Sequence, residues 1–469
     1  MAKGGQVMNR RELLMTMANG FGMAALSRVL AASSSASNPL EPKTPHFTAK
    51  AKHVIFLFLN GGPSQVDTFD PKPALEKYHG KPLPGANQVI SGGGIKLPVS
   101  SLMKSPFSFK KYGQSGLDAS ELFAKTAECI DDICVIRSMY TDIPNHPPGL
   151  CMMNTGHNVA GRPSLGSWLT YGLGTENQNL PGFVVLCPGI PIMGPQLWSS
   201  SFLPATYQGT WVQNNESDPE KLIPFLRGGF TGQPEQRRQL DLLGKLNRLQ
   251  LSKEGPSASL EATIQSMETA YRMQAEAMDA FDISKEAEKT RTAYGSSDFA
   301  NGCLMARRLV ERGVRMVQVY FGAGQPWDDH SDILHHKSLA QQSDQPIAAL
   351  LRDLKDRGML QETLVMIGGE FGRSPSVQAT VGGLQNGRDH NSYAFTMLLA
   401  GGGVKGGMAY GATDDFGLRV AEKPVHPHDL HATILHLCGF DHTKLTYRYS
   451  GRDFRLTDVE GRVVKDILA

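Results

Sequence analysis

His53-Val-Ile-Phe-Leu-Phe-Leu-Asn60 is a continuous apolar run that ends at a pair of glycines. Such a run predicts a strand buried on both faces, as in a parallel sheet. Similar runs recur along the chain, and helical patterns fall between several of them. This alternation predicts an α/β fold with a mainly parallel sheet. The further strand runs are 133–136, 183–186, 314–320, 363–367 and 395–399, and the clearest helical patterns are 300–312 and 338–357.

Residues 234–295 differ from the rest of the chain because they are polar and contain no apolar strand run. The stretches 236–251 and 260–280 have helical spacing. We predict a helical insertion beside the sheet. A pair of surface crossover helices explains the same pattern equally well.

The composition is that of an ordinary soluble globular protein, with 469 residues, 40% hydrophobic and 20% charged. A formal net charge of +2 gives no indication of a nucleic-acid partner or an anionic membrane surface. The 6 cysteines form no CxxC pair. We expect most of them to be buried free thiols.

The first residues are typical of an export signal. Arg10 and Arg11 are adjacent, and a weakly apolar stretch with several glycines and one further arginine follows them. The stretch is too polar for a stable membrane-spanning helix, so no transmembrane segment is expected in the mature chain. We predict a twin-arginine signal peptide over 1–36, a linker over 37–50 and one domain over 51–469. Export by the twin-arginine translocase would bring the protein to the periplasm or outside the cell; an amphipathic N-terminal helix is the alternative.

Polar side chains follow the predicted strands, and in open α/β sheets binding sites form beyond the carboxyl ends of the strands. Asn60 and Asp67 follow the first strand in a glycine-containing turn, and either side chain offers an oxygen ligand to a metal. The alternative is a polar turn that caps a helix.

The densest group of acidic and histidine residues follows the run 314–320. It includes Asp328, Asp329 and His330. Carboxylate and imidazole together suit zinc, manganese or iron, whereas carboxylates alone suit calcium or magnesium. A solvated polar loop is the alternative.

The motif GGEFGRSP (368–375) follows the next strand. Glu370 offers a metal ligand, and the Arg373 guanidinium offers contacts to an anion. A Glu370–Arg373 salt bridge is the alternative.

The motif GRDHN (387–391) precedes the last strand run. We expect a short loop in which Arg388 contacts an anion while Asp389 and His390 bind a metal. One site at the strand ends would gather all four motifs.

Six segments together resemble a known family. They are similar to the domain-of-unknown-function family 1501, which is sulfatase-like and is grouped with the alkaline phosphatase-like superfamily. The resemblance covers nearly all of 50–469. It implies a three-layer α/β/α sandwich and one or two divalent ions such as zinc, calcium or manganese. The segments are FLNGGPSQVDTFDPKP (58–73), WDDH (327–330), GGEFGRSP, GRDHN, LLAGGGVKGG (398–407) and HPHDLHATILHLCGF (426–440).

The resemblance also implies site residues. Asn60 stands where these enzymes carry a metal-binding Asp, Asp328 and His330 resemble the central ligand pair, and His390 resembles a late ligand with Asp389 beside it. Glu370 begins a motif that resembles Asp-His-Gly, with Phe371 in place of the His.

The nucleophile position departs from the family pattern. His146 stands where sulfatases have the residue that becomes formylglycine, and the sulfatase arginine is absent. We expect His146 to act as a general base toward water or as a covalent nucleophile, and Arg373 and Arg388 to hold the anion.

The resulting prediction is an exported metal-dependent hydrolase of sulfate or phosphate esters, acting on a small molecule or a polysaccharide. The alternative is a non-catalytic exported binding or cell-surface assembly protein with a degenerate site. An isomerase or mutase is a third interpretation.

Overall fold

The structure is a computed structural model of the chain, and it describes residues 38–84, 100–216, 219–222, 233–254, 267–268, 271–272, 276–380 and 383–469. The predicted signal peptide over 1–36 lies outside these described residues. Residues 38–50 of the predicted linker contain no helix or strand. In the described part of the chain, no helix combines the length and apolarity needed to cross a membrane.

A central sheet of 8 strands runs through the molecule in the order β12-β4-β11-β8-β1-β7-β5-β6. Strand β11 is antiparallel to both of its neighbours, and the other neighbouring pairs are parallel. The predicted, mostly parallel α/β sheet is therefore confirmed. The strands are β1 His53–Phe58, β4 Ile133–Met139, β5 Phe183–Leu186, β6 Thr210–Val212, β7 Met316–Tyr320, β8 Thr363–Gly368, β11 Phe395–Ala400 and β12 Met408–Tyr410.

All six apolar runs of the sequence form strands of this sheet, because each is buried on both faces. Every residue of β1 and of β8 is buried. Ile55 and Leu57 belong to the hydrophobic core on one face of the sheet. Val54 and Phe56 belong to the core on the other face, as the alternation of a strand requires.

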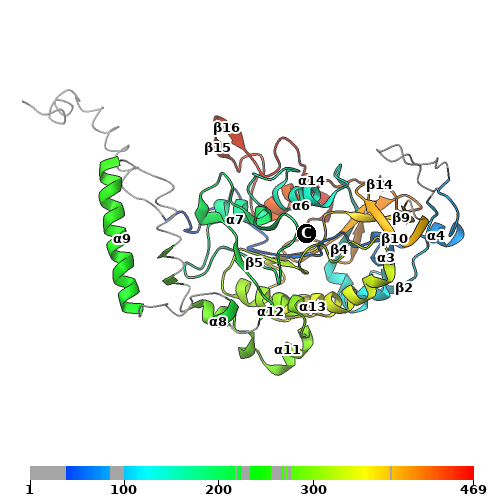
Figure 1. The fold of residues 1–469 in the computed structure, drawn as a ribbon, viewed down its shortest axis with the longest axis horizontal. Helices are drawn as coiled ribbons and strands as arrows, with labels where there is room; N and C mark the ends of the chain where they lie inside the picture. Colours follow the sequence, from blue (N-terminus) through cyan, green and yellow to red (C-terminus); the bar gives the residue numbers. More distant parts are fainter. Residues whose placement is uncertain are drawn as a thin grey trace, which may run out of the picture.

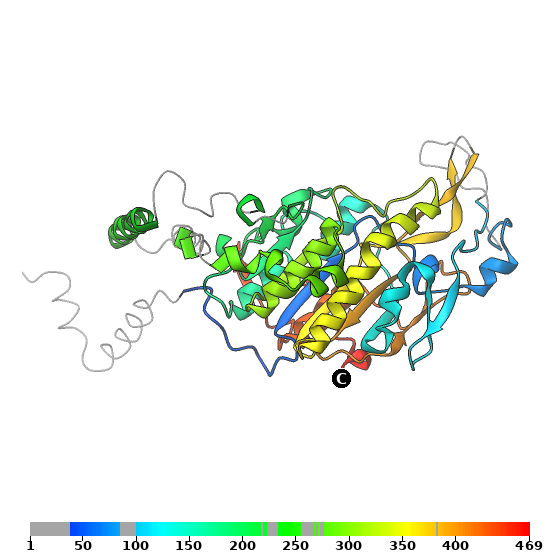
Figure 2. The ribbon, with the colours of Figure 1, turned by 90° about the horizontal axis from the view of Figure 1, so that it is seen from below.

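Helices cover both faces, which gives three layers (Figure 1). Helices α12 and α13 cover one face, and the predicted helices 300–312 and 338–357 are thereby confirmed. Helices α6, α7 and α14 cover the other face. Figure 2 shows α12 and α13 lying over the strands. The helices are α6 His146–Thr155, α7 Leu165–Leu173, α12 Asp298–Glu311, α13 His336–Asp356 and α14 Pro427–Leu437.

An antiparallel hairpin of β9 (Gly372–Thr380) and β10 (Gly383–Asn391) stands beyond the edge of the sheet. The prediction of a short loop over 387–391 is wrong, because these residues pair with β9. The smaller elements are β2 Phe109–Tyr112, β3 Leu117–Ser120, β13 Ala412–Thr413, β14 Val420–Glu422, β15 Tyr447–Tyr449, β16 Arg452–Phe454, α3 Gln65–Thr68, α4 Pro73–Lys77 and α5 Ala124–Ala127.

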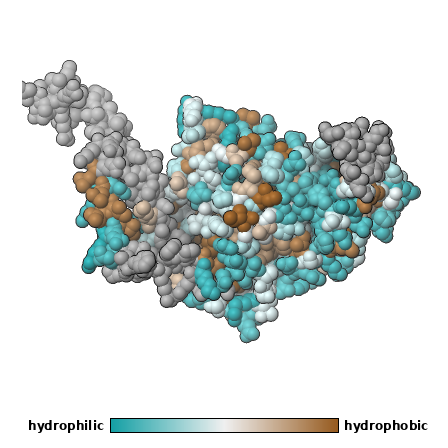
Figure 3. Space-filling model, in the orientation of Figure 1, coloured by the Kyte–Doolittle hydropathy of each residue, from teal (hydrophilic) through white to brown (hydrophobic). Residues whose placement is uncertain are grey.

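Helix α9 (Gln233–Glu254) corresponds to the first helix expected in the polar region, and Figure 1 shows it beside the layered body. Its leucines Leu242 and Leu246 are exposed, and Figure 3 shows apolar residues on this helix. The expected helix over 260–280 falls largely outside the described residues. Two shorter helices are α8 Pro219–Leu222 and α11 Glu288–Tyr294. All 6 cysteines are free and buried, as predicted.

Candidate metal centre

Four side chains from distant parts of the chain meet beyond the carboxyl ends of the parallel strands. His146 is the first residue of α6, which follows β4, and Asp328 and His330 lie in the loop after β7. His390 lies in β10, just before β11. Because β11 runs antiparallel, its start lies at the edge where β4 and β7 end. These residues form the histidine–aspartate cluster (His146, Asp328, His330 and His390).

Local sequence explains how two of these residues reach the centre. Pro147 lies in the first turn of α6, where its fixed φ suits a helix start and positions His146. Gly387 lets β10 approach the loop after β7 closely. A Cβ atom at this position would lie 2.0 Å from the carbonyl carbon of His330, so any other residue would push His390 away.

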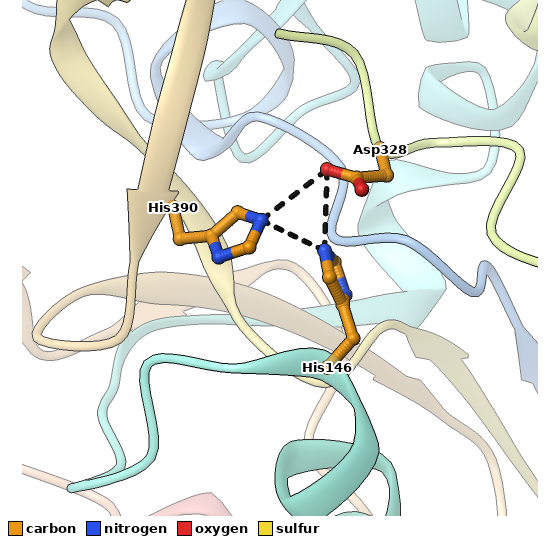
Figure 4. A group of neighbouring side chains, drawn as sticks. All are labelled: His146, Asp328 and His390. Atoms are coloured by element: carbon orange, nitrogen blue, oxygen red, sulfur yellow. Dashed lines mark hydrogen bonds and ion pairs between the residues drawn. The ribbon is translucent and has the colours of Figure 1, made fainter. Parts of the chain in front are cut away.

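The ligand atoms of the cluster converge, and Figure 4 shows three of its four residues, His146, Asp328 and His390. The Nε2 atom of His390 lies 2.8 Å from that of His146 and 3.0 Å from that of His330. The Oδ1 atom of Asp328 lies 2.9 Å from the Nε2 atom of His330, 3.2 Å from that of His146 and 3.3 Å from that of His390. For comparison, ligand atoms around a tetrahedral zinc ion are about 3.3 Å apart.

Glu370 fixes the orientation of His146. The Nδ1 atom of His146 lies 2.5 Å from Oε1 of Glu370, which is fully buried. The same carboxylate accepts hydrogen bonds from the Gly61 N–H at 3.1 and 3.2 Å. A carboxylate accepts, so Nδ1 of His146 carries the proton and its Nε2 has a lone pair.

The other two histidines are held in the same way. Nδ1 of His390 lies 2.8 Å from the Pro144 carbonyl oxygen, which accepts its proton. Nδ1 of His330 lies 2.8 Å from Oε1 of Gln378. The amide nitrogen of Gln378 donates to the Ala379 carbonyl at 2.9 Å, so its oxygen faces His330. Both Nε2 atoms therefore present lone pairs.

Three imidazole lone pairs and a carboxylate oxygen thus face a common region. Lone pairs repel one another at these distances unless a proton or a metal cation lies between them. Metal-binding histidines usually donate their other ring N–H to a carboxylate or carbonyl, as these do. The donor set therefore fits a divalent transition-metal ion.

Without a metal ion, a second proton on a histidine occupies the same region, where its Nε2–H donates to Asp328, and the pKa values show this preference for positive charge. Burial alone lowers the pKa of His146, but hydrogen bonds with Asp328 and Glu370 outweigh this effect and raise it above its usual value. The hydrogen bond to Asp328 raises the pKa of His330 despite partial burial. Burial raises the pKa of Asp328, but its hydrogen bonds with the three histidines hold it far below its usual range.

The cluster reaches solvent on one side. The side chain of His330 is 35% exposed, that of Asp328 is 23% and that of His390 is 18%, whereas His146 is 6% exposed. An incoming molecule would therefore reach the cluster past His330. His146, expected to be a base or nucleophile, lies at the closed end.

Asn60 and Glu370 are near the cluster but are engaged elsewhere. The Asn60 amide donates to the carbonyl oxygens of Gly322 at 3.0 Å and Gly324 at 2.7 Å, so it joins β1 to the loop after β7. Glu370 contacts His146 rather than the converging lone pairs. The structure thus gives both residues positioning roles in place of the expected metal contacts.

Arg373 and Arg388 are both fully buried. Arg373 donates to Asp328 Oδ1 at 2.6 Å, and the Glu370–Arg373 salt bridge considered as the alternative is not formed. Arg388 makes a bidentate pair with Asp67, at 2.6 and 3.1 Å. The sequence suggested that these two arginines hold an anion, but neither guanidinium faces solvent in the structure.

Asp389 lies at the rim, with a 58% exposed side chain 3.8 Å from Nδ1 of His330. Gln378 and the Pro144 carbonyl also hold the cluster, although no sequence motif marks either of them. In the described part of the chain, no Ser, Thr or Cys side chain hydrogen-bonds to the cluster.

Several solved structures are similar to this chain at 10 to 11% sequence identity. The PsFucS1 sulfatase from Pseudoalteromonas sp. gives a TM-score of 0.34, with 89% of this chain and 70% of that chain covered. Ps i-CgsB gives 0.38, with 83% and 72% covered. The lipoteichoic acid synthase LtaP from Listeria monocytogenes gives 0.39, with 89% and 78% covered. At these values the likeness carries no argument about activity.

No curated protein matches the sequence. A family model described as "Protein of unknown function (DUF1501)" matches residues 51–468. The match spans the whole sheet, both helical layers and every residue of the cluster, and it confirms the family predicted from the motifs. The chain belongs to the DUF1501 family.

Proposed function

We propose that this chain is an exported metal-dependent hydrolase of sulfate or phosphate esters. The observation that supports this proposal is the convergence of three Nε2 atoms and the Oδ1 atom of Asp328 on one region. His146, Asp328 and His390 form a compact group with ligand atoms within 4.8 Å of one another. Three protein ligands and an open position are the usual arrangement of a catalytic zinc site.

The donor set narrows the choice of metal. The two imidazoles and one carboxylate of His146, His390 and Asp328 suit zinc, manganese or iron, whereas calcium prefers about six to eight oxygen ligands. A bound ion would supply a Lewis acid that polarises the ester and activates water. Of the ions expected from the sequence, zinc and manganese therefore fit better than calcium.

The protein's own residues have distinct roles in this proposal. His146, Asp328 and His390 hold the ion. His330, the most exposed of the histidines, accepts a proton from the attacking water through its Nε2 atom. A water nucleophile needs no hydroxyl side chain, which agrees with the contacts of the described residues.

A non-catalytic binding or assembly protein is the second candidate, and one observation favours it. Pro147 and Pro148 occupy the first turn of α6 and carry no N–H, so this helix start offers few donors to an anion. If His330 also binds the ion, four protein ligands close a tetrahedral site, as in structural zinc centres.

His330→Ala distinguishes the two candidates. The protein would be stripped with chelator, reloaded with zinc or manganese and assayed on aryl phosphate and aryl sulfate esters. The hydrolase proposal predicts that His330→Ala retains the ion and loses about 10²–10⁴-fold in rate. The closed-site candidate predicts loss of the ion and no hydrolysis by any form.

His46→Ala is the matched control. His46 is exposed and precedes β1, near the amino ends of the parallel strands and away from the cluster. It should leave metal content and rate unchanged. A metal-loaded wild type that hydrolyses no sulfate or phosphate ester would contradict the hydrolase proposal.

Export is proposed from the twin arginines alone. Changing Arg10 and Arg11 to Lys should keep the protein in the cytoplasm, because the twin-arginine translocase reads that pair. Cell fractionation measures the distribution. Unchanged export of the double variant would contradict this route.

A further inference from the structure

The Arg373 guanidinium lies in a cradle of oxygen atoms beside the cluster. Its Nε atom donates to the Gly62 carbonyl at 2.9 Å. Its Nη2 atom donates to the carbonyls of Gly61 and Trp327 and to Asp328 Oδ1. Three backbone carbonyls and a carboxylate are ligands that a hard cation such as calcium prefers. The side chain is fully buried, so this positive charge is permanently enclosed.

The ligand atoms of the cluster can bind only one ion at a time. Two groups of ligand atoms can be drawn, His146 with Asp328 and His390, and His330 with Asp389 and His390, and they share His390. Nδ1 of His390 is directed at the Pro144 carbonyl, so its Nε2 lone pair serves both groups. One imidazole lone pair binds one ion. The two groups are therefore alternatives within a single centre.

The nearby oxygen ligands that a second ion would need are engaged. Glu370 accepts from the Gly61 N–H and from His146. Asp67 is held by Arg388. Phe371 packs on the rings of His146 and His390, with centroid distances of 4.6 and 4.8 Å, and fills space beside both.

The charges around the cluster also favour a single divalent ion. Three carboxylates contact or border the cluster, and Arg373 neutralises one charge. The two remaining negative charges match one divalent ion. A second divalent ion beside a buried guanidinium would leave positive charge without a partner, which is costly in a buried site. The carboxylates are Asp328, Glu370 and Asp389.

We propose that the cluster binds one divalent metal ion per chain and that Arg373 is a built-in cation, filling the oxygen cradle where a second ion would bind. This inference rests on the proposed metal-dependent function and specifies its ion number. Arg373 is thereby a positioning residue, which holds Asp328 through a charge-assisted hydrogen bond.

Stoichiometry of the wild type is the first test. The full chain would be stripped, incubated with excess manganese and calcium together, freed of unbound ions and analysed by elemental mass spectrometry. We expect one manganese and no calcium per chain. Two ions per chain, in any combination, would overturn this inference while leaving the proposed function intact. No bound ion at all would overturn the proposed function itself.

Variants of Arg373 test the cradle. Arg373→Ala removes the guanidinium and frees its oxygen partners, whereas Arg373→Lys keeps a positive charge. We expect calcium to add a second ion to Arg373→Ala and to raise its melting temperature, with neither effect in Arg373→Lys or the wild type. A folded Arg373→Ala protein that gains no calcium would overturn the assignment of the cradle. The wild-type stoichiometry does not depend on whether either variant folds.

Discussion

Glu370 and His146 are joined by a buried contact of 2.5 Å between Oε1 and Nδ1, across 224 residues of sequence. The contact fixes which nitrogen of His146 carries the proton. It also turns the other nitrogen toward Asp328 and His390. The chemistry of the cluster therefore depends on a carboxylate that does not itself face the converging lone pairs.

Glu370→Gln should weaken metal binding about 10–100-fold, as other changes to the partners of metal ligands do. The amide keeps the size of the carboxylate but loses the charge that supports His146. Competition with a chromophoric chelator measures the dissociation constant. Glu362→Gln, at an exposed glutamate paired with Lys52, is the control and should have no effect. Equal metal affinities of Glu370→Gln and the wild type would show that the Glu370–His146 contact does not support His146 as a metal ligand.

Gly61→Ala should destabilise the protein and weaken metal binding. Gly61 has a φ of +115°, and a Cβ atom there would lie 2.5 Å from the backbone nitrogen of Asp328. Gly80→Ala is matched, because Gly80 has a φ of +77° and open space around its Cβ position. Both variants carry about 1–3 kcal/mol of backbone strain, but Gly61→Ala must also displace Asp328. If melting temperature and metal affinity fall equally in both variants, the close approach of Gly61 to the Asp328 backbone is not the cause of the loss.

Arg388→Met should lower stability by about 3–5 kcal/mol, because it leaves the Asp67 charge buried without its partner. Both side chains of this pair are 0% exposed. The double variant with Asp67→Asn should recover part of the loss. Arg448→Met removes a partner of Asp453 from a pair in which the Arg448 side chain is 68% exposed, and should cost less than about 1 kcal/mol. Chemical denaturation measures the free energy of unfolding of the wild type, the two single variants and the double variant. A loss below about 1 kcal/mol in Arg388→Met would show that the pair with Asp67 is not required, and Arg388 would then be free for the anion role expected from sequence.

Acid should destabilise the protein partly through His431. Burial lowers the pKa of His431 to about 3. Between pH 6.5 and about 3 the unfolded chain binds a proton that folded His431 refuses, so stability falls with pH by about 1.4 kcal/mol per unit for this group. His431→Gln retains a donor for the Met153 carbonyl, which His431 contacts at 2.9 Å, and should show a shallower decline. Calorimetric melting from pH 4.5 to 8 measures the slope, with exposed His46→Gln as the control; parallel slopes in all three proteins would contradict the assignment.

The sheet could be predicted because strands buried on both faces are continuous apolar runs. All six such runs, beginning with 53–60, form strands of the central sheet. Strands β6 and β12 lie at its two edges and have 3 residues each, too few for a pattern. The hairpin of β9 and β10 was missed because its sequence is polar and rich in turn-forming residues.

Three residues of the cluster could be predicted because binding sites in open α/β sheets form beyond the carboxyl ends of the strands. Asp328, His330 and His390 follow or precede strands whose ends share an edge, so topology alone brings them together. His146 was singled out from a helix start that resembles the sulfatase pattern. The structure places its Nε2 atom among the ligand atoms.

The roles of the other residues depended on partners that sequence does not reveal. Arg388 has the right chemistry for an anion, but Asp67 reaches it across 321 positions. Arg373 likewise contacts Asp328 and four backbone carbonyl oxygens. Gln378 holds His330, although no spacing or motif links the two. Such pairings follow from the packing of the hairpin against the sheet edge rather than from local pattern.

Metal content of the mature protein is the decisive measurement for the metal centre. The protein would be purified without chelator and analysed by elemental mass spectrometry, beside His146→Ala, His390→Ala and the control His46→Ala. We predict one transition-metal ion per chain in the wild type and the control, and its loss from both cluster variants. A folded wild type that contains no metal, and takes up none when manganese or zinc is supplied, would contradict this prediction.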